Sequence, residues 1–341
     1  MTRLIILTYG QKTEHKRAVF AILSFWAWYS GKRADAQTLV FTDQPDFFTP
    51  YFTGLPVEYE LLTSDKLEAL RGPQQFVHRV KVAIIAQALR EYPDDNVLFC
   101  DSDTFFVAES DQLLLQLQAG VSLMHLREYR ITEAVDIHAA FNQAEYPRKL
   151  IDLINSRTFE FGKQEIQFRD SLFMWNSGVL GLTKEFTEIM PDILALNDAL
   201  YAGTEWFTSE QIAFSLALQI KTRIIPSQQY VFHYWGQRQK LLMDGLLNTL
   251  LTPHFIEQDM SIRLNEVRQL TTKWWRSIEL DKDREGAVYA FSKGEVVAGI
   301  KCTIKALFAS PFNIAFAKDL VRVLQKAVRN QRNYNSCPNT N

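Results

Sequence analysis

Two aspartates, Asp101 and Asp103, interrupt an otherwise apolar run that reads Val-Leu-Phe-Cys-Asp-Ser-Asp-Thr-Phe-Phe over residues 97–106. Carboxylates one residue apart can project from a turn toward the same point, where they repel each other unless a cation lies between them. A hard divalent ion such as Mg²⁺ or Mn²⁺ prefers oxygen ligands and commonly shares them with substrate phosphates. The pattern predicts a metal-diphosphate site, and it also fits a plain polar turn after a buried strand.

Short apolar runs surround this pair along the first hundred residues. They are expected to form strands buried on both faces of a parallel sheet, and they cover residues 4–7, 38–43, 57–62 and 97–100. Helical spacing predicts helices over residues 17–30 and 73–92. Strands that alternate with helices indicate an open α/β sheet, in which ligands bind beyond the carboxyl ends of the strands. If the first, second and fourth strands are neighbours, residues 8–9, 42–43 and 101–103 converge on one crevice.

The alternation is looser after Asp103. Further strands are expected over residues 121–126, 172–182 and 223–226, and a helix over residues 206–220. We find no internal repeat and no low-complexity segment.

Composition excludes several classes of protein. The chain has 341 residues, of which 47% are hydrophobic and 22% charged, so it has enough apolar material for a core and is not expected to be disordered. A net charge of −2 argues against a nucleic-acid binder. Three distant cysteines and no apolar run near the ~20 residues of a spanning helix predict a cytoplasmic protein in a reducing compartment.

Four segments resemble the GT-A fold glycosyltransferases, and in particular glycosyltransferase family 8, the group of glycogenin and the bacterial galactosyltransferases. Residues 98–104 are similar to the D-x-D segment, and residues 175–180 (Trp-Asn-Ser-Gly-Val-Leu) to the group's "FNSGV" strand. Residues 209–218 resemble its "DQ" helix, and residues 232–236 its H-x-x-G motif. Two departures are that Glu210 replaces the usual aspartate, and that Lys240 comes one place late without the Pro-Trp that usually follows.

The resemblance implies a fold and a division of the chain. The fold is α/β, with the single mixed sheet of the GT-A nucleotide-diphospho-sugar transferases flanked by helices, and a helical C-terminal appendage. The catalytic domain is expected at residues 1–245, with a nucleotide-binding half at 1–105 and a donor-sugar and acceptor half at 106–245. A mostly helical basic segment would follow at 246–332, and a disordered tail at 333–341.

The resemblance also implies a nucleotide-sugar donor, most often UDP-linked, with Mn²⁺ or Mg²⁺ on its diphosphate. By motif, the metal ligands are Asp101, Asp103 and His233. Further residues are expected to contact the donor: Thr8, Tyr9, Thr42, Asp43, Arg79, Lys81, Ser102, Asn176, Gly178, Gly236 and Lys240.

Three residues are candidates for catalysis. Glu210 and Gln211 would lie against the reacting face, where a carboxylate either stabilises an oxocarbenium-like transition state or acts as a general base. Asp170 is the reserve candidate for the base. Whether the anomeric configuration is retained or inverted stays open, and the acceptor is a glycan, a lipid-linked sugar or a protein.

Residues 293–332 carry eight basic and two acidic residues. One interpretation is a helical appendage with a solvated cationic face. The other is a surface that makes peripheral contact with an anionic membrane, at the inner membrane face.

Other functions fit parts of the sequence. D-x-D-x-T after a buried strand also matches the haloacid-dehalogenase-like phosphatases, with Asp101 as the nucleophile, but the second acidic pair of that class is not evident. A sugar-nucleotide pyrophosphorylase would need a glycine-rich N-terminal loop, of which residues 7–12 are a poor version. A non-catalytic nucleotide-sugar-binding protein is the third alternative.

Overall fold

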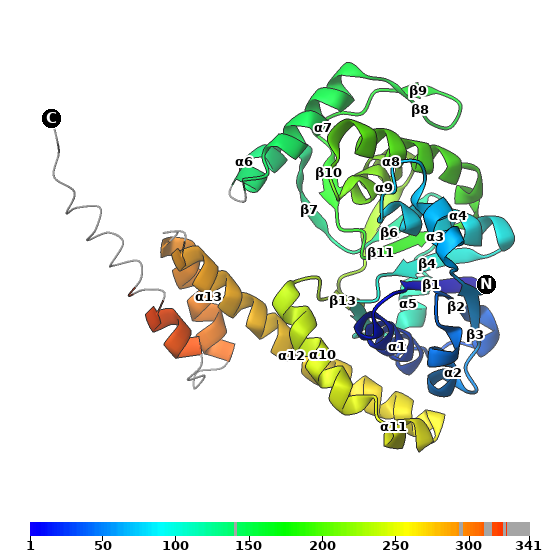
Figure 1. Ribbon diagram of the computed structural model, residues 1–341, viewed down its shortest axis with the longest axis vertical. Coiled ribbons are helices and arrows are strands. Elements are labelled where there is room, and N and C mark those ends of the chain that lie inside the picture. Colours follow the sequence, from blue (N-terminus) through cyan, green and yellow to red (C-terminus); the bar gives the residue numbers. More distant parts are fainter. Residues whose placement is uncertain (140–141, 293–295, 310–315, 323–324, 326–341) are drawn as a thin grey trace. The chain divides into compact units, whose positions relative to one another are not determined.

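The computed structural model describes residues 1–139, 142–292, 296–309, 316–322 and 325 (Figure 1). The chain divides into two units. The first comprises Met1–His233 and Met243–Gln269, and the second Tyr234–Leu242 and Leu270–Asn341. The tail expected at residues 333–341 lies outside the described residues.

Seven strands of the first unit form one sheet in the order β12-β6-β11-β4-β1-β2-β3. Neighbouring strands are parallel except at β11, which is antiparallel to both β4 and β6. This mixed, mostly parallel sheet flanked by helices confirms the predicted α/β class, and the order β2-β1-β4 brings the ends of those three strands together. The bounds are β1 (Thr2–Thr8), β2 (Ala36–Thr42), β3 (Val57–Leu61), β4 (Asn96–Cys100), β6 (Val121–Met124), β11 (Val179–Leu182) and β12 (Arg223–Pro226).

Three two-stranded ladders accompany the main sheet. They pair β13 (Val231–His233) with β5 (Thr104–Phe106), β10 (Phe173–Trp175) with β7 (Arg127–Arg130), and β8 (Phe159–Glu160) with β9 (Glu165–Ile166). The single strand expected over residues 172–182 was therefore wrong. It breaks because the backbone N–H of Gly178 donates to the side chain of Asn176 at 3.0 Å, so that β10 pairs with β7 while β11 joins the main sheet.

Helices fill the connections. Their bounds are α1 (Lys12–Ala27), α2 (Pro45–Phe52), α3 (Ser64–Arg71), α4 (Arg79–Glu91), α5 (Ser110–Leu114), α6 (Ala134–Ala139), α7 (Glu145–Ser156), α8 (Met190–Thr204), α9 (Ser209–Lys221), α10 (Gln237–Leu250), α11 (Pro253–Glu257), α12 (Met260–Ser292) and α13 (Val296–Ala309). The helix expected over residues 73–92 begins only at Arg79, because Gln75 adopts a positive φ of 52°, which a right-handed helix does not contain.

The sheet is buried on both faces, as its unbroken apolar strands predict. Ile5, Leu39 and Phe99 pack in one cluster with α4, α8 and α9. The alternate residues Leu4 and Leu98 point to the other face and are at most 1% exposed. Helix α1 packs on β1 and on β5, the short strand that follows the two aspartates.

The second unit is helical in its described part. Ala287, Ala306 and Phe316 form its small buried cluster, with Cys302 packed against it. Cys302 and the buried Cys100 carry free thiols, and Cys337 lies outside the described residues. Among the described residues, no helix combines the length and apolar character needed to cross a membrane.

Candidate active site

The two aspartates follow β4, which lies between β1 and β11 in the sheet. Asp101 donates its backbone N–H to the carbonyl of Gly178 at 2.9 Å. The hydroxyl of Thr104 donates to the carbonyl of Asp101 at 2.7 Å and closes the turn. Both carboxyl groups are thereby held at the carboxyl edge of the sheet, where ligands bind in folds of this kind.

His233 reaches this turn through the small ladder outside the main sheet. In the antiparallel pairing of β13 with β5, His233 lies opposite Thr104, and its Nε2 atom lies 3.2 Å from Oδ1 of Asp103. One ligand atom from each of Asp101, Asp103 and His233 lies within 4.8 Å of the other two. The structure thus brings together the three residues that the sequence predicted as metal ligands.

The hydrogen bonds of His233 show that this cluster fits a cation. Oδ1 of Asn176 accepts the N–H of Gly178 at 3.0 Å and lies 2.9 Å from Nδ1 of His233, so Nδ1 must carry the hydrogen. In the neutral ring, Nε2 then presents a lone pair to the carboxylate of Asp103. Two electron-rich atoms 3.2 Å apart repel unless a proton or a metal ion lies between them.

Gly178 is a steric requirement of this arrangement. A Cβ atom at this position would lie 2.3 Å from Nδ1 of His233 and 2.4 Å from Cε1. No side chain can therefore be accommodated unless the imidazole moves away from Asn176 and Asp103.

Lys81 forms a buried ionic cluster next to the aspartates. Its Nζ atom lies 3.1 Å from Asp101 and 2.7 Å from Oε1 of Glu210. It also lies 3.2 Å from the carbonyl of Ser177. The Ser177 hydroxyl donates to Oε1 of Glu210 at 2.7 Å. Glu210 is only 4% exposed, so its carboxylate is engaged inside the protein.

Charge pairing favours the ionised forms of Lys81 and Glu210. Burial alone would lower the pKa of Lys81, but the carboxylates of Asp101 and Glu210 outweigh burial and raise it. Burial would likewise raise the pKa of Glu210, but Lys81 outweighs burial and lowers it. For Asp101, burial is the larger effect and raises its pKa, with Lys81 opposing and Asp103 adding to the rise. A further cation beside Asp101 and Asp103 would favour their ionised forms.

Glu128, on β7, is the residue that the sequence reasoning missed. Its carboxylate accepts from Nε2 of Gln211 at 3.0 Å and from Nδ2 of Asn176 at 3.4 Å. Burial raises the pKa of Glu128, and these two hydrogen bonds oppose the rise. Nothing in the spacing of the Arg-Glu-Tyr-Arg strand singles out this acid. Glu128 lies near Asn176 because β7 pairs with β10, and this tertiary pairing leaves no mark in the local sequence.

Ser102, between the two aspartates, is linked to α1. Its hydroxyl donates to Oε2 of Glu14 at 2.8 Å, and Glu14 is paired with Arg17. Arg17 in turn donates twice to Asp244, at 2.7 Å each. The turn that carries the aspartates is therefore braced by a chain of ion pairs that begins on α10.

The predicted nucleoside residues meet at the ends of β1 and β2. Asp43 accepts the backbone N–H of Gly10 at 3.0 Å. Thr8 and Thr42 are buried, at 3% and 0% exposed, and the Thr8 hydroxyl lies 3.0 Å from Nδ1 of His15. Asp43 is the more accessible of these groups, with 27% of its side chain exposed, and Tyr9 is partly buried against the core.

Four residues that were predicted to contact the donor or to act in catalysis have contacts outside the cluster of Asp101, Asp103 and His233. Arg79 donates to Asp198 at 2.7 Å and so ties α4 to α8. Asp170 accepts from Asn155 of α7 at 3.5 Å and from the backbone of Thr132 through its carbonyl. Gly236 and Lys240 belong to the second unit, where Lys240 donates its backbone N–H to the carbonyl of Gly236 at 2.9 Å.

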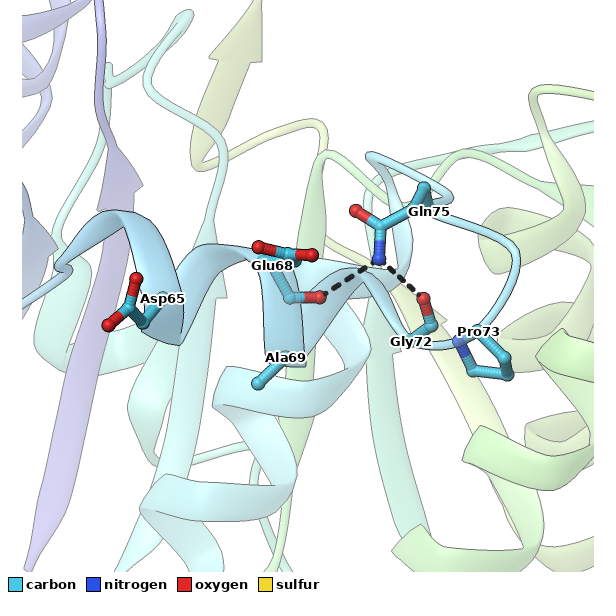
Figure 2. A pocket seen from close by; sticks show the side chains of 6 residues that line it. All are labelled: Asp65, Glu68, Ala69, Gly72, Pro73 and Gln75. Carbon is cyan, nitrogen blue, oxygen red and sulfur yellow. Dashed lines mark hydrogen bonds between the residues drawn. The ribbon is translucent and has the colours of Figure 1, made fainter.

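A surface hollow next to α3 is separate from this cluster. Figure 2 shows its lining of Asp65, Glu68, Ala69, Gly72, Pro73 and Gln75. The side chain of Gln75 donates to the carbonyls of Glu68 and Gly72, at 3.3 and 2.9 Å. The polar groups of this turn thus hydrogen-bond to one another, and none of the predicted site residues lines the hollow.

The sequence matches no family profile and no curated protein. Several solved structures are similar in fold to this chain. They include mouse xyloside xylosyltransferase 1 (10% identity, TM-score 0.44, covering 67% of this chain and 86% of that one). The galactosyltransferase LgtC with donor and acceptor sugar analogues gives 13% identity and a TM-score of 0.46, covering 73% and 96%. The bifunctional glycosyltransferase WbbM gives 12% identity and a TM-score of 0.49, and the match covers 77% of this chain but only 51% of that one. At these identities and TM-scores the likeness is too distant to support an inference about substrate or reaction.

Proposed function

We propose that this protein is a metal-dependent glycosyltransferase that transfers a sugar from a nucleotide-diphosphate donor to an acceptor hydroxyl. A UDP-linked sugar is the expected donor. The observation that carries this proposal is the position of His233, whose Nε2 atom faces Asp103 at 3.2 Å while Nδ1 is committed to Asn176. The motif resemblance supports the same function, but membership of family 8 stays a prediction.

In this proposal Asp101, Asp103 and His233 hold Mn²⁺ or Mg²⁺, and the mixed set of oxygen and imidazole ligands suits Mn²⁺. When bound, such an ion neutralises the charge that develops on the departing diphosphate. Asn176 orients the imidazole through its Nδ1 hydrogen, and Gly178 leaves space for the ring.

Lys81 and Glu210 act as positioning residues in this proposal. Lys81 fixes the carboxylate of Asp101, and Glu210 holds Lys81 from the buried side. Because Glu210 is committed to this pair, Gln211 is the better candidate for contact with the sugar. Its neighbour Glu128 presents a carboxylate that can accept hydrogen bonds from sugar hydroxyls.

The donor contacts proposed for Thr8, Tyr9, Thr42, Asp43, Arg79, Ser102, Gly236 and Lys240, and the reserve role of Asp170, remain predictions. Asp43 is the first of these to test. Its carboxylate lies at the ends of β1 and β2, the edge where the nucleoside is expected.

A thermal-shift panel tests the binding step. UDP, GDP, CDP and ADP are added with and without Mn²⁺ to the wild type, to Asp103→Asn and to the control Asp46→Asn, which alters an exposed aspartate on α2. We expect a stabilisation that needs both UDP and Mn²⁺ and is absent from Asp103→Asn only. No combined effect with any nucleotide would contradict the proposal.

Activity measurements separate the alternatives. Release of UDP from UDP-sugars in the presence of Mn²⁺ supports a transferase. Hydrolysis of p-nitrophenyl phosphate with Mg²⁺, lost in Asp101→Asn, would instead indicate the phosphatase. Nucleotide and metal binding without UDP release, across UDP-glucose, UDP-galactose and UDP-xylose, would favour a non-catalytic binding protein.

A further inference from the structure

Helix α13 of the second unit carries an exposed apolar stripe. Six of its apolar side chains are exposed to between 39% and 87%, and these are Val296, Val297, Ile300, Ile304, Leu307 and Phe308. Phe308 is the most exposed, at 87%. Single exposed apolar residues are ordinary, but a contiguous apolar patch marks an interaction surface.

The six positions share one side of the helix. At about 100° per residue they fall within a sector of roughly 120°. The residues that pack inward lie on the opposite side, where Ala306 is fully buried and Cys302 is packed against the same cluster. Helix α13 therefore has one side that packs within the second unit and another that is apolar and exposed.

Two lysines border this stripe. Lys301 and Lys305 are both exposed and lie on one edge of it, about 20° and about 60° beyond Phe308 by the same helical geometry. Helix α13 contains no acidic residue. The surrounding stretch 293–332 carries a net charge of +6, so the remaining residues carry −8 in a chain whose total is −2. The cationic charge is thus concentrated in the same stretch of the sequence as the apolar stripe.

We propose that α13 is a membrane-surface helix that lays its apolar stripe into the interface of an anionic bilayer while Lys301 and Lys305 contact lipid phosphates. An apolar sector bordered by lysines is the pattern of helices that lie in the bilayer plane. With 14 residues, α13 is about 21 Å long, too short to span a membrane.

Charge decides between the bilayer and a second copy of the chain. Two α13 helices packed stripe to stripe would cover the apolar side chains but would leave the lysines of both helices with no acid on either helix to pair with. An anionic lipid surface supplies the missing negative charge. This inference goes beyond the proposed function, whose metal cluster of Asp101, Asp103 and His233 lies in the first unit, so either can fail without the other.

Vesicle co-sedimentation tests the inference. The full chain is mixed with vesicles of phosphatidylcholine alone or with 30 mol% phosphatidylglycerol. Ile304→Ser/Phe308→Ser removes part of the stripe, and Ile262→Ser on α12 is its exposed apolar control. Lys301→Gln/Lys305→Gln removes the bordering charges, and Lys273→Gln/Arg276→Gln on α12 is the matched charge control.

We expect binding only to the vesicles that contain phosphatidylglycerol. The apolar double variant should bind at least tenfold more weakly, and the lysine double variant roughly 30-fold more weakly at low salt. Both controls should bind like the wild type. Because every altered side chain is exposed, thermal unfolding should be unchanged in all variants.

Three results would overturn the inference. Equal binding to both vesicle types would remove the role of charge, and unchanged binding by Ile304→Ser/Phe308→Ser would remove the role of the stripe. Concentration-dependent dimerisation in sedimentation velocity, abolished by the same apolar variant, would identify a second copy as the occupant.

Discussion

The Nζ atom of Lys81 lies 2.7 Å from Oε1 of Glu210, and both side chains are buried within the first unit. The same ammonium lies 3.1 Å from Asp101. One buried cation thus serves two carboxylates, of which only Asp101 belongs to the predicted metal cluster. The charge balance of this cluster links the stability of the fold to the geometry of the candidate site.

Lys81→Met should lower the free energy of unfolding by about 3–5 kcal/mol, because it leaves the buried Glu210 and the partly buried Asp101 without their partner. Lys81→Met/Glu210→Gln should recover part of this loss, since one of the unpaired charges is gone. Urea denaturation measures both. Lys184→Met, which breaks an exposed pair at 3.8 Å, is the control and should change stability by less than about 1 kcal/mol. A double variant no more stable than Lys81→Met would contradict the pairing.

Gly178→Ala should abolish the stabilisation by Mn²⁺ and UDP, because its Cβ atom would lie 2.3 Å from the His233 ring. Gly245→Ala is a matched change in α10, where a Cβ would meet nothing within 4 Å. It should stabilise the protein by about 0.5–1 kcal/mol and leave metal binding unchanged. Thermal shift with a Mn²⁺ titration measures both effects. Wild-type Mn²⁺ affinity in Gly178→Ala would show that the ring does not need its present position.

Asn176→Ala should weaken Mn²⁺ binding by about 10–100-fold, because the variant no longer accepts the Nδ1 hydrogen of His233. Isothermal titration with Mn²⁺ in the presence of UDP gives the affinity. Asn248→Ala, at an exposed asparagine that accepts from Lys16, is the control. If both variants bind Mn²⁺ equally well, Asn176 does not orient the metal ligand.

His15 predicts a pH dependence of stability. Burial lowers the pKa of His15 below 6.5, although Asp43 and Glu14 oppose the change. The folded state therefore resists protonation more than the unfolded state does. The contribution of the neutral His15 ring to the free energy of unfolding is fully present above about pH 6.5, the pKa of the unfolded state. It is lost as the pH falls from there through the lower pKa of the folded state.

The test compares melting temperatures between pH 7.5 and 5. His15→Gln should lose less on acidification than the wild type, whereas His254→Gln, at an exposed position, should follow the wild type. An identical pH profile for wild type and His15→Gln would show that this ring contributes nothing to the acid response.

Continuous apolar runs made the main sheet predictable. Residues 4–7, 38–43 and 97–100 became β1, β2 and β4, because strands buried on both faces need no polar alternation. Helix starts were less accurate. Helix α1 begins at Lys12 rather than residue 17, since its first turn consists of polar residues and carries no apolar signal.

The candidate site was predictable where a motif marked it, and not where the fold alone assembled it. Asp101 and Asp103 were found by spacing, and His233 by resemblance. The β13–β5 ladder that joins them is three residues long on each side and leaves little periodic pattern to read. The engagement of Glu210 by Lys81, and of Asn176 by His233, depends on tertiary contacts that no local pattern encodes.

The pairing of His233 with Thr104 also determines how the binding of a metal ion would be coupled to folding. A cation held by Asp103 and His233 would act as a reversible cross-link that closes a chain segment of about 130 residues, and closing so long a loop removes configurational freedom from the unfolded chain. Chelation would therefore lower the melting temperature of the whole first unit, rather than loosen a single loop.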